Sequence, residues 1–339
     1  MKILVAGGMG YIGSILSVEL LKKNHEVIIV DNLSNVPERT SKYGTINSLI
    51  SDRQAYNVYY RMLDVNNDFE ALEEIFEEED IDLIINLAAD KSVENGENNP
   101  DKMFQNNINI QTNLLRLAEK YGVDNFIFAS TATVYTISNT LPFTEDQVML
   151  PIRMCNYGYS KYIGEELLER SDINYINFRF FNVIGASEDG VLGELGGNNI
   201  VPKLLECSAN HKIFKINGND YNTIDGTPAR DYIDVNDIID AITLVIDNLE
   251  ENKNYIKDLT ESTFNLGTGK SVTVKELVDT YNDIVDEKDR VKYEYSNKRP
   301  GDEEELVCDP TLAEEKLDFV PRRSLEESLR SAYKYYKQR

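Results

Sequence analysis

The sequence predicts an α/β protein with a doubly wound parallel sheet, and three observations support this prediction. Over residues 1–180, short apolar runs that fit buried strands alternate with longer amphipathic stretches that fit helices. A glycine-rich turn separates the first strand from the first helix, and the second strand ends in an acidic residue. Such alternation indicates a parallel sheet with helices on both faces.

The expected elements follow in order along the chain. Strands are predicted at residues 2–6, 26–30, 57–63, 81–87, 125–129 and 175–180, and helices at 12–23, 68–79, 103–121 and 157–170. Beyond residue 180 the alternation loosens into turn-rich segments around helices at 235–249 and 274–285 and strands at 213–216 and 263–266. We therefore expect a nucleotide-binding domain over residues 1–180 and a smaller α/β C-terminal substrate lobe over 181–339, with the lobes interleaved.

Composition excludes several classes of protein. Of the 339 residues 41% are hydrophobic, and no apolar run is long enough to cross a bilayer. A net charge of −24 argues against binding to nucleic acid or to an anionic membrane. The first residues do not resemble a signal peptide. Three scattered cysteines, Cys155, Cys207 and Cys308, fit neither a disulfide framework nor a metal site. We expect a cytoplasmic protein without a metal.

The first turn carries a fingerprint for dinucleotide binding. Gly7, Gly10 and Gly13 allow a tight turn, close approach of a pyrophosphate and packing of the helix on the strand. The helix N-terminus supplies N–H groups and a positive dipole for the phosphates. Asp31 ends the second strand, where its carboxylate would bind ribose hydroxyls and repel a 2′-phosphate. The pattern predicts NAD rather than NADP.

Later strand ends add candidates at the same edge of the sheet. Small residues and a lysine follow the fourth strand, at Ala88-Ala89-Asp90-Lys91. Small side chains there let a cofactor lie against the backbone. Lys91 either reaches the cofactor or is an ordinary exposed loop lysine, and its position alone does not decide.

Tyr157 and Lys161 are the candidate acid–base pair. Their spacing puts both side chains on one face of a helix, and a nearby ammonium would favour the phenolate of a tyrosine. Thr131 follows the fifth strand and so should meet them at the ligand edge of the sheet. The spacing alone is a weak signal, because Tyr333 and Lys337 share it in a charged C-terminal helix, where a solvated face explains them.

Together these motifs resemble those of a known family. They are Gly7 to Gly13, Asp31 to Asn35, Thr131 to Tyr135, Tyr157 to Lys161, Arg179 to Asn182 and Gly218 to Tyr232. The chain is similar, over residues 2–309, to the extended short-chain dehydrogenases/reductases, in their NAD-dependent epimerase/dehydratase family, and within them to the UDP-glucose 4-epimerases. The segment from Asp225 to Tyr232 is the most telling part of the resemblance.

The resemblance implies a role for many positions. The residues implied for NAD are Gly7, Gly10, Tyr11, Ile12, Gly13, Asp31, Asn32, Leu33, Ser34, Asn35, Val36, Asp64, Val65, Leu87, Ala88, Ala89, Asp90, Lys91, Asn106, Thr131, Tyr157, Lys161 and Phe181. Those implied for a UDP-sugar are Thr131, Tyr157, Asn182, Asn199, Ile200, Lys215, Ile216, Asn217, Arg230, Arg299, Pro300, Gly301, Asp302 and Leu306. The two arginines would neutralise the diphosphate.

The implied reaction inverts C4 of the sugar. No side chain is basic enough to remove that C–H proton, so hydride would pass to NAD while Tyr157, assisted by Lys161, takes the hydroxyl proton. The 4-keto sugar would turn over and receive the hydride on its other face. The chain resembles an isomerase that keeps its NAD through turnover. The family also suggests a homodimer through the helices at 103–121 and 157–170.

The sugar and the reaction type leave alternatives. Leu306 stands where size is thought to admit or exclude N-acetyl sugars, and Asn217 replaces an expected phenylalanine beside the uracil. UDP-glucose, UDP-N-acetylglucosamine and UDP-glucuronate all remain candidates. A 4,6-dehydratase would need an acid pair where Ala132 and Thr133 stand. Asp31 disfavours an NADP-dependent reductase. A non-catalytic NAD sensor would lack Tyr157, Lys161 or Thr131, and all three are present.

Overall fold

The computed structural model describes residues 1–35, 42–136, 140–298 and 303–339, and the chain divides into two compact units. Unit 1 comprises residues 1–136, 148–179 and 241–264. Unit 2 comprises residues 137–147, 180–240 and 265–339. The chain therefore passes from one unit to the other several times. Among the described residues, no helix is both long enough and apolar enough to cross a membrane.

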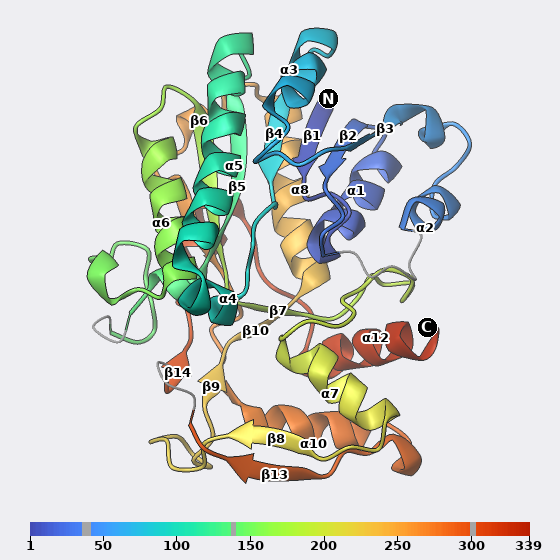
Figure 1. Ribbon diagram of the computed structural model, residues 1–339, viewed down its shortest axis with the longest axis vertical. Helices are drawn as coiled ribbons and strands as arrows, with labels where there is room; N and C mark the ends of the chain where they lie inside the picture. Colours follow the sequence, from blue (N-terminus) through green and yellow to red (C-terminus); the bar gives the residue numbers. More distant parts are fainter. Residues whose placement is uncertain (36–41, 137–139, 299–302) are drawn as a thin grey trace. The chain divides into compact units, whose positions relative to one another are not determined.

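A seven-stranded sheet confirms the predicted fold class (Figure 1). Its strands are β1 (Lys2–Ala6), β2 (Glu26–Asp31), β3 (Val58–Met62), β4 (Leu83–Asn86), β5 (Asn125–Thr131), β6 (Asn174–Phe180) and β11 (Thr263–Leu266), in the order β11-β6-β5-β4-β1-β2-β3. β1 pairs in parallel with β2 and β4, β2 with β3, and β4 with β5. The strand order reverses direction at β1 and β4. In Rossmann-type sheets ligands bind outside the carboxyl ends of the strands at this point.

Helices cover the sheet. They are α1 (Tyr11–Lys22), α3 (Phe69–Glu78), α5 (Pro100–Tyr121), α6 (Asn156–Glu169) and α8 (Val235–Glu251), with the short helices α2 (Lys42–Ser48), α4 (Val93–Asn98) and α9 (Tyr255–Asp258). The sequence did not predict α2 or α4. Both are short, so neither contains enough residues to establish a helical period.

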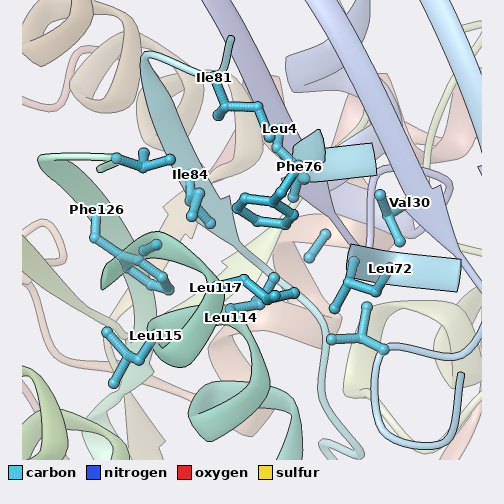
Figure 2. Close-up of a cluster of buried hydrophobic side chains, with 14 of the residues drawn as sticks. Leu4, Val30, Leu72, Phe76, Ile81, Ile84, Leu114, Leu115, Leu117 and Phe126 are labelled. Atoms are coloured by element: carbon cyan, nitrogen blue, oxygen red, sulfur yellow. The ribbon is translucent and has the colours of Figure 1, made fainter. Parts of the chain in front are cut away.

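The core of unit 1 explains why the strand sequences are apolar at nearly every position. On one face, Leu4 and Val30 pack with Phe76 of α3, Leu114 of α5 and Phe126 of β5 (Figure 2). The intervening strand residues, such as Ile3 and Val5, are buried as well. A parallel strand covered on both faces needs apolar side chains on both.

Unit 2 has short strands around its own core. Its strands are β7 (Asn182–Ile184), β8 (Phe214–Asn217), β9 (Ala229–Arg230), β10 (Tyr232–Asp234), β12 (Val272–Thr273), β13 (Tyr293–Ser296) and β14 (Glu305–Leu306). Its helices are α7 (Ile200–Ala209), α10 (Val274–Ile284), α11 (Thr311–Leu317) and α12 (Leu325–Lys337). The strands form three small sheets, β10-β7, β12-β9-β14 and β13-β8. Leu204, Phe214, Leu277, Tyr281 and Leu329 lie in the core.

Candidate active site

The glycine turn after β1 leaves no room for side chains. Gly7 has φ +79°, and a Cβ there would lie 2.8 Å from the backbone N of Ala88. A Cβ at Gly13 would lie 2.2 Å from the carbonyl O of Gly7. The turn thus packs tightly against the chain after β4 and against the first turn of α1. This close backbone approach is the geometry that a dinucleotide-binding turn requires.

Asp31 connects the glycine turn to the loop after β2. Its carboxylate accepts the backbone N–H of Met9 at 2.9 Å and that of Leu33 at 2.7 Å. Asn32 accepts the N–H of Ser34 at 3.0 Å in the same loop. An ionised carboxylate offers about four acceptor positions, so Asp31 can also receive hydroxyl donors from a ribose. Asn35 is exposed, and Val36 lies outside the described residues.

The loop after β4 is tied to α5 and α6 by one buried side chain. Asn107 accepts the N–H of Asp90 at 2.8 Å, and its amide donates to the Asp90 carbonyl at 3.0 Å and to Ser160 at 2.9 Å. Its neighbour Asn106, which the resemblance implies for the cofactor, donates to Asn107 at 3.3 Å. Lys91 is exposed. Sequence reasoning did not identify Asn107 as the residue that fixes this loop.

Two more of the candidate cofactor positions, Asp64 and Val65, follow β3. Asp64 accepts the N–H of Asn66 at 2.9 Å and the amide of Asn67 at 3.0 Å, which closes the turn that leads to α3. Val65 is buried in the unit 1 core. This turn follows the carboxyl end of a parallel strand, as the loops after β1 and β2 do.

Tyr157 lies in the first turn of α6. Burial raises the pKa of Tyr157 above its usual value, and the nearby Thr131 hydroxyl opposes this rise. Thr131 Oγ1 also lies 3.1 Å from Thr133 Oγ1. A Cβ at Gly158 would lie 2.2 Å from the Thr133 carbonyl O, so α6 begins in direct contact with the turn that carries Thr131. The structure therefore brings the predicted tyrosine and threonine together.

Lys161 is buried on the same face of α6 and points toward β5. Its ammonium donates to the Ala129 carbonyl at 2.7 Å and lies 4.6 Å from the centre of the Phe128 ring. Burial lowers the pKa of Lys161 to about 7, against an opposing effect of Glu165. Among the described residues, no hydrogen bond joins this ammonium to Tyr157, although the sequence predicted that the two would interact.

Behind Lys161 lies a buried ion pair that sequence reasoning missed. Arg179 of β6 donates to both oxygens of Glu165, at 3.0 and 2.7 Å. Glu165 follows Lys161 by four residues, so the spacing that identified Tyr157 and Lys161 could have found Glu165, though not its partner Arg179 on another element.

In unit 2, the candidate substrate residues include Arg230 and Leu306 on neighbouring strands. β14 pairs in parallel with β9, which places Leu306 opposite Arg230. Arg230 is buried and donates to its neighbour's carbonyl, that of Ala229, at 2.7 Å. Asn182, on β7, donates its N–H to the Asp231 carbonyl at 3.0 Å. Phe181 is buried.

The remaining substrate candidates lie elsewhere in unit 2. Asn199 is the N-cap residue of α7, which begins at Ile200, but its side chain makes no capping bond and donates instead to Glu194 at 2.8 and 3.0 Å. On β8, Asn217 accepts the Ser296 hydroxyl at 2.8 Å. Lys215 is an exposed β8 residue, and Ile216 is buried. The predicted Arg299, Pro300, Gly301 and Asp302 lie outside the described residues.

A glycine turn, an acidic β2 end, and a tyrosine on α6 near the threonine that ends β5 resemble the dinucleotide site of the short-chain dehydrogenase type. Comparison with known proteins agrees. The chain belongs to the NAD dependent epimerase/dehydratase family, whose pattern matches residues 3–267. The resemblance read from the sequence is thus confirmed, and the residues of unit 1 fit the NAD on which this family depends.

Similar proteins cover the whole chain. A UDP-glucose 4-epimerase of Caenorhabditis elegans is 33% identical over 96% of this chain and 95% of its own. One of Bacillus subtilis is 32% identical over 99% and 96%. A crystal structure of UDP-glucose-4-epimerase from Stenotrophomonas maltophila, with bound NAD and formylated UDP-arabinopyranose, is 30% identical with a TM-score of 0.89, covering 100% of this chain and 98% of that one.

Proposed function

We propose that the protein is a UDP-sugar 4-epimerase that interconverts UDP-glucose and UDP-galactose. The observation that carries this proposal is that the first turn of α6, which contains Tyr157, packs against the turn that follows Thr131 at the carboxyl end of β5. A phenol and a hydroxyl at one strand end can together bind a sugar hydroxyl and exchange its proton. The full-length similarity to UDP-glucose 4-epimerases supports the assignment.

In the proposed mechanism Tyr157 accepts the proton of the 4-hydroxyl while Thr131 holds the same oxygen. The glycine turn and Asp31 would hold NAD, which would supply reversible hydride transfer at C4. Loss of proton and hydride would give a ketone at C4, and return of the hydride to the opposite face would give the epimer, so no net oxidation would occur. The side chain of Lys161 would hold a positive charge near the phenol and favour its ionised form.

The residues proposed to hold the nucleotide lie in unit 2. Arg230 carries a fixed positive charge that a diphosphate would neutralise. Leu306, opposite Arg230 in the strand register, is the residue proposed to select the sugar. The alternative substrates are the N-acetyl pair and UDP-glucuronate. A structural neighbour from Campylobacter jejuni, 32% identical with a TM-score of 0.79, is a UDP-Glc/GlcNAc 4-epimerase.

We also propose a homodimer located in the cytoplasm. Phe104 of α5 and the partly exposed Tyr159 of α6 stack edge to face with ring centres 5.7 Å apart, which gives these two helices an aromatic surface. Aromatic residues are common in protein interfaces. The three cysteines are all free, as a reducing compartment requires. Light scattering of the purified protein tests the dimer, and a monomer would contradict it.

The test offers the purified protein each UDP-sugar without added cofactor and follows the C4 epimers by NMR. We expect interconversion of UDP-glucose and UDP-galactose, and a loss of about 10²- to 10⁴-fold in Tyr157→Phe, because the general base is gone. Tyr333→Phe is the matched control, since Tyr333 has the same spacing to a lysine, and its rate should match the wild type. No epimer from any UDP-sugar would refute the function. An unchanged rate in Tyr157→Phe would refute the mechanism.

A further inference from the structure

The buried pair of Glu165 and Arg179 has no part in the reaction as described above. Both side chains are nearly inaccessible, at 7% and 6% exposure, and their contact is bidentate. An unpaired charge buried here would strongly destabilise the folded protein, so each side chain requires its partner. Replacing both residues of a buried ion pair by apolar ones often leaves the free energy of unfolding unchanged. Stability alone therefore does not account for a charged pair at this position.

The pair is attached to both sides of the turn that carries Thr131. Ser130, the preceding residue on β5, donates its hydroxyl to Glu165. Tyr135, which ends the turn, accepts a hydrogen bond from Arg179 at 3.0 Å, and the guanidinium lies 5.1 Å from its ring centre. Since Glu165 is on α6, the network fixes this turn to the helix that carries Tyr157.

The pair also determines the charge around Lys161. Glu165 lies one helical turn beyond Lys161 and raises the pKa of that lysine, but both of its oxygens are occupied by Arg179 and Ser130. Lys161 itself bonds to a neutral carbonyl and a ring. Arg179 thus keeps Glu165 from forming an ion pair with Lys161, which would hold the proton on the amine.

We propose that Glu165 and Arg179 are positioning residues for the Tyr157 site, which fix the Thr131 turn to α6 and keep the Glu165 carboxylate paired with Arg179 instead of with Lys161. The proposal rests on the proposed function. The titratable and charged groups around this site are Tyr157 and Glu165 on α6, Arg179 on β6, Tyr135 after β5, Cys155 before α6 and Asp90 after β4. Glu165 and Arg179 can be substituted without changing the predicted acid–base residues.

Substitutions of the two partners should act in opposite directions. Glu165→Gln leaves two buried cations together, which makes protonation of Lys161 harder. Arg179→Gln frees the carboxylate to pair with Lys161, which makes protonation easier. Arg179→Lys keeps the cation and should restore behaviour close to that of the wild type. A purely structural role would give no such opposite pair of effects.

The measurement is an NMR titration of the protein labelled with ¹³C in its lysine side chains, with the Lys161 signal identified by its loss in Lys161→Met. The expected wild-type midpoint is about 7. We expect Glu165→Gln to lower it by about one pH unit, and Arg179→Gln to raise it by about as much. Glu166→Gln is the control, because it removes the same charge from a partly exposed position on the same helix, where Glu166 accepts a hydrogen bond from Arg170 at 3.1 Å. Unchanged midpoints in both buried variants would overturn the proposal.

A neutral variant tests the positioning part and remains usable if the charged variants do not fold. Tyr135→Phe removes the hydrogen bond to Arg179 but keeps every charge and the ring. We expect kcat to fall about tenfold with KM unchanged, while the Lys161 midpoint stays in place. An unchanged kcat would overturn the positioning role. A protein without epimerase activity would refute the proposed function. The titration needs no substrate, so the Lys161 midpoints would still show whether Glu165 and Arg179 control the charge of Lys161.

Discussion

Lys161 is an ionisable side chain buried at a cost to stability. Its exposure is 4%, and burial lowers the pKa of its ammonium from 10.5 to about 7. The unfolded chain therefore binds more protons than the folded protein between about pH 7 and pH 10.5. In this window the free energy of unfolding rises with pH. Below it, the folded protein carries the full cost of burying the charged ammonium.

Lys161→Met should accordingly stabilise the protein at acid pH. The penalty removed corresponds to about 3 to 5 kcal/mol, and the lost hydrogen bond to Ala129 offsets about 1 kcal/mol of it. We expect a net gain in the free energy of unfolding of about 2 to 4 kcal/mol near pH 6, which disappears toward pH 10. Urea denaturation of both proteins at the two pH values, at equal cofactor loading, measures this. An equal gain in the free energy of unfolding at both pH values would show that the ammonium of Lys161 is not buried with a lowered pKa.

The spacing of Tyr157 and Lys161 placed both on one face of α6, as the structure has them, but it did not predict what each side chain contacts. Lys161 turns to the Ala129 carbonyl because β5 lies directly beneath this face of the helix. Glu165 has the same spacing from Lys161, but its partner Arg179 is close only after β6 has folded into the sheet. The spacing therefore does not predict this ion pair. A helical period identifies neighbours on one helix and not across the sheet.

At the scale of elements, the second tyrosine–lysine pair has a different role from the first. Tyr333 and Lys337 of α12 both contact Asp289 of the short 3-10 helix at Glu287–Asp289, at 2.7 and 3.2 Å. The hydrogen bond from Tyr333 is the main cause that lowers the pKa of Asp289. The two residues therefore hold the last helix in place, and are not simply a solvated face.

Tyr333→Phe removes the phenol that Asp289 depends on. We expect a loss of about 1 to 2 kcal/mol in the free energy of unfolding at neutral pH, as is usual for a hydrogen bond to a charged acceptor. Because the folded state lowers the pKa of Asp289, this contribution should fade as the pH falls below about 4 and the carboxyl takes up a proton. Denaturant unfolding at neutral and acid pH measures the loss and its dependence on pH. An equal loss at both pH values would argue against a hydrogen bond from Tyr333 to an ionised Asp289.

Most elements of the sheet were predictable from sequence because their apolar runs are unambiguous. The predicted strand at 2–6 matches β1, and the one at 263–266 matches β11. The helix predicted at 103–121 begins earlier, at Pro100, where a proline is well suited to the first turn. In unit 2, β9, β12 and β14 have two residues each, too few to show a period of two. Their pairing, and with it the placement of Leu306 opposite Arg230, became visible only in the fold.

At the scale of the whole molecule, the net charge of −24 dominates the electrostatics. Like charges repel most in the compact state, and salt screens this repulsion. We expect the melting temperature to rise by about 3 °C or more between about 0.02 M and 0.5 M sodium chloride. Thermal unfolding in the two buffers measures it, with potassium chloride as the control for ion identity. A fall with salt would mean that attractive ion pairs outweigh the excess of negative charge.

The division of unit 1 into three stretches has a consequence for synthesis on the ribosome. Its last stretch, residues 241–264, contains most of α8 and the first half of β11, which lies beside β6 at the edge of the sheet. Residue 264 of 339 must therefore have left the exit tunnel before unit 1 can close its sheet. By then most of unit 2 has already been made. Folding of unit 1 thus waits on a late segment, and a nascent chain halted near residue 180 would present β6 with an unpaired edge.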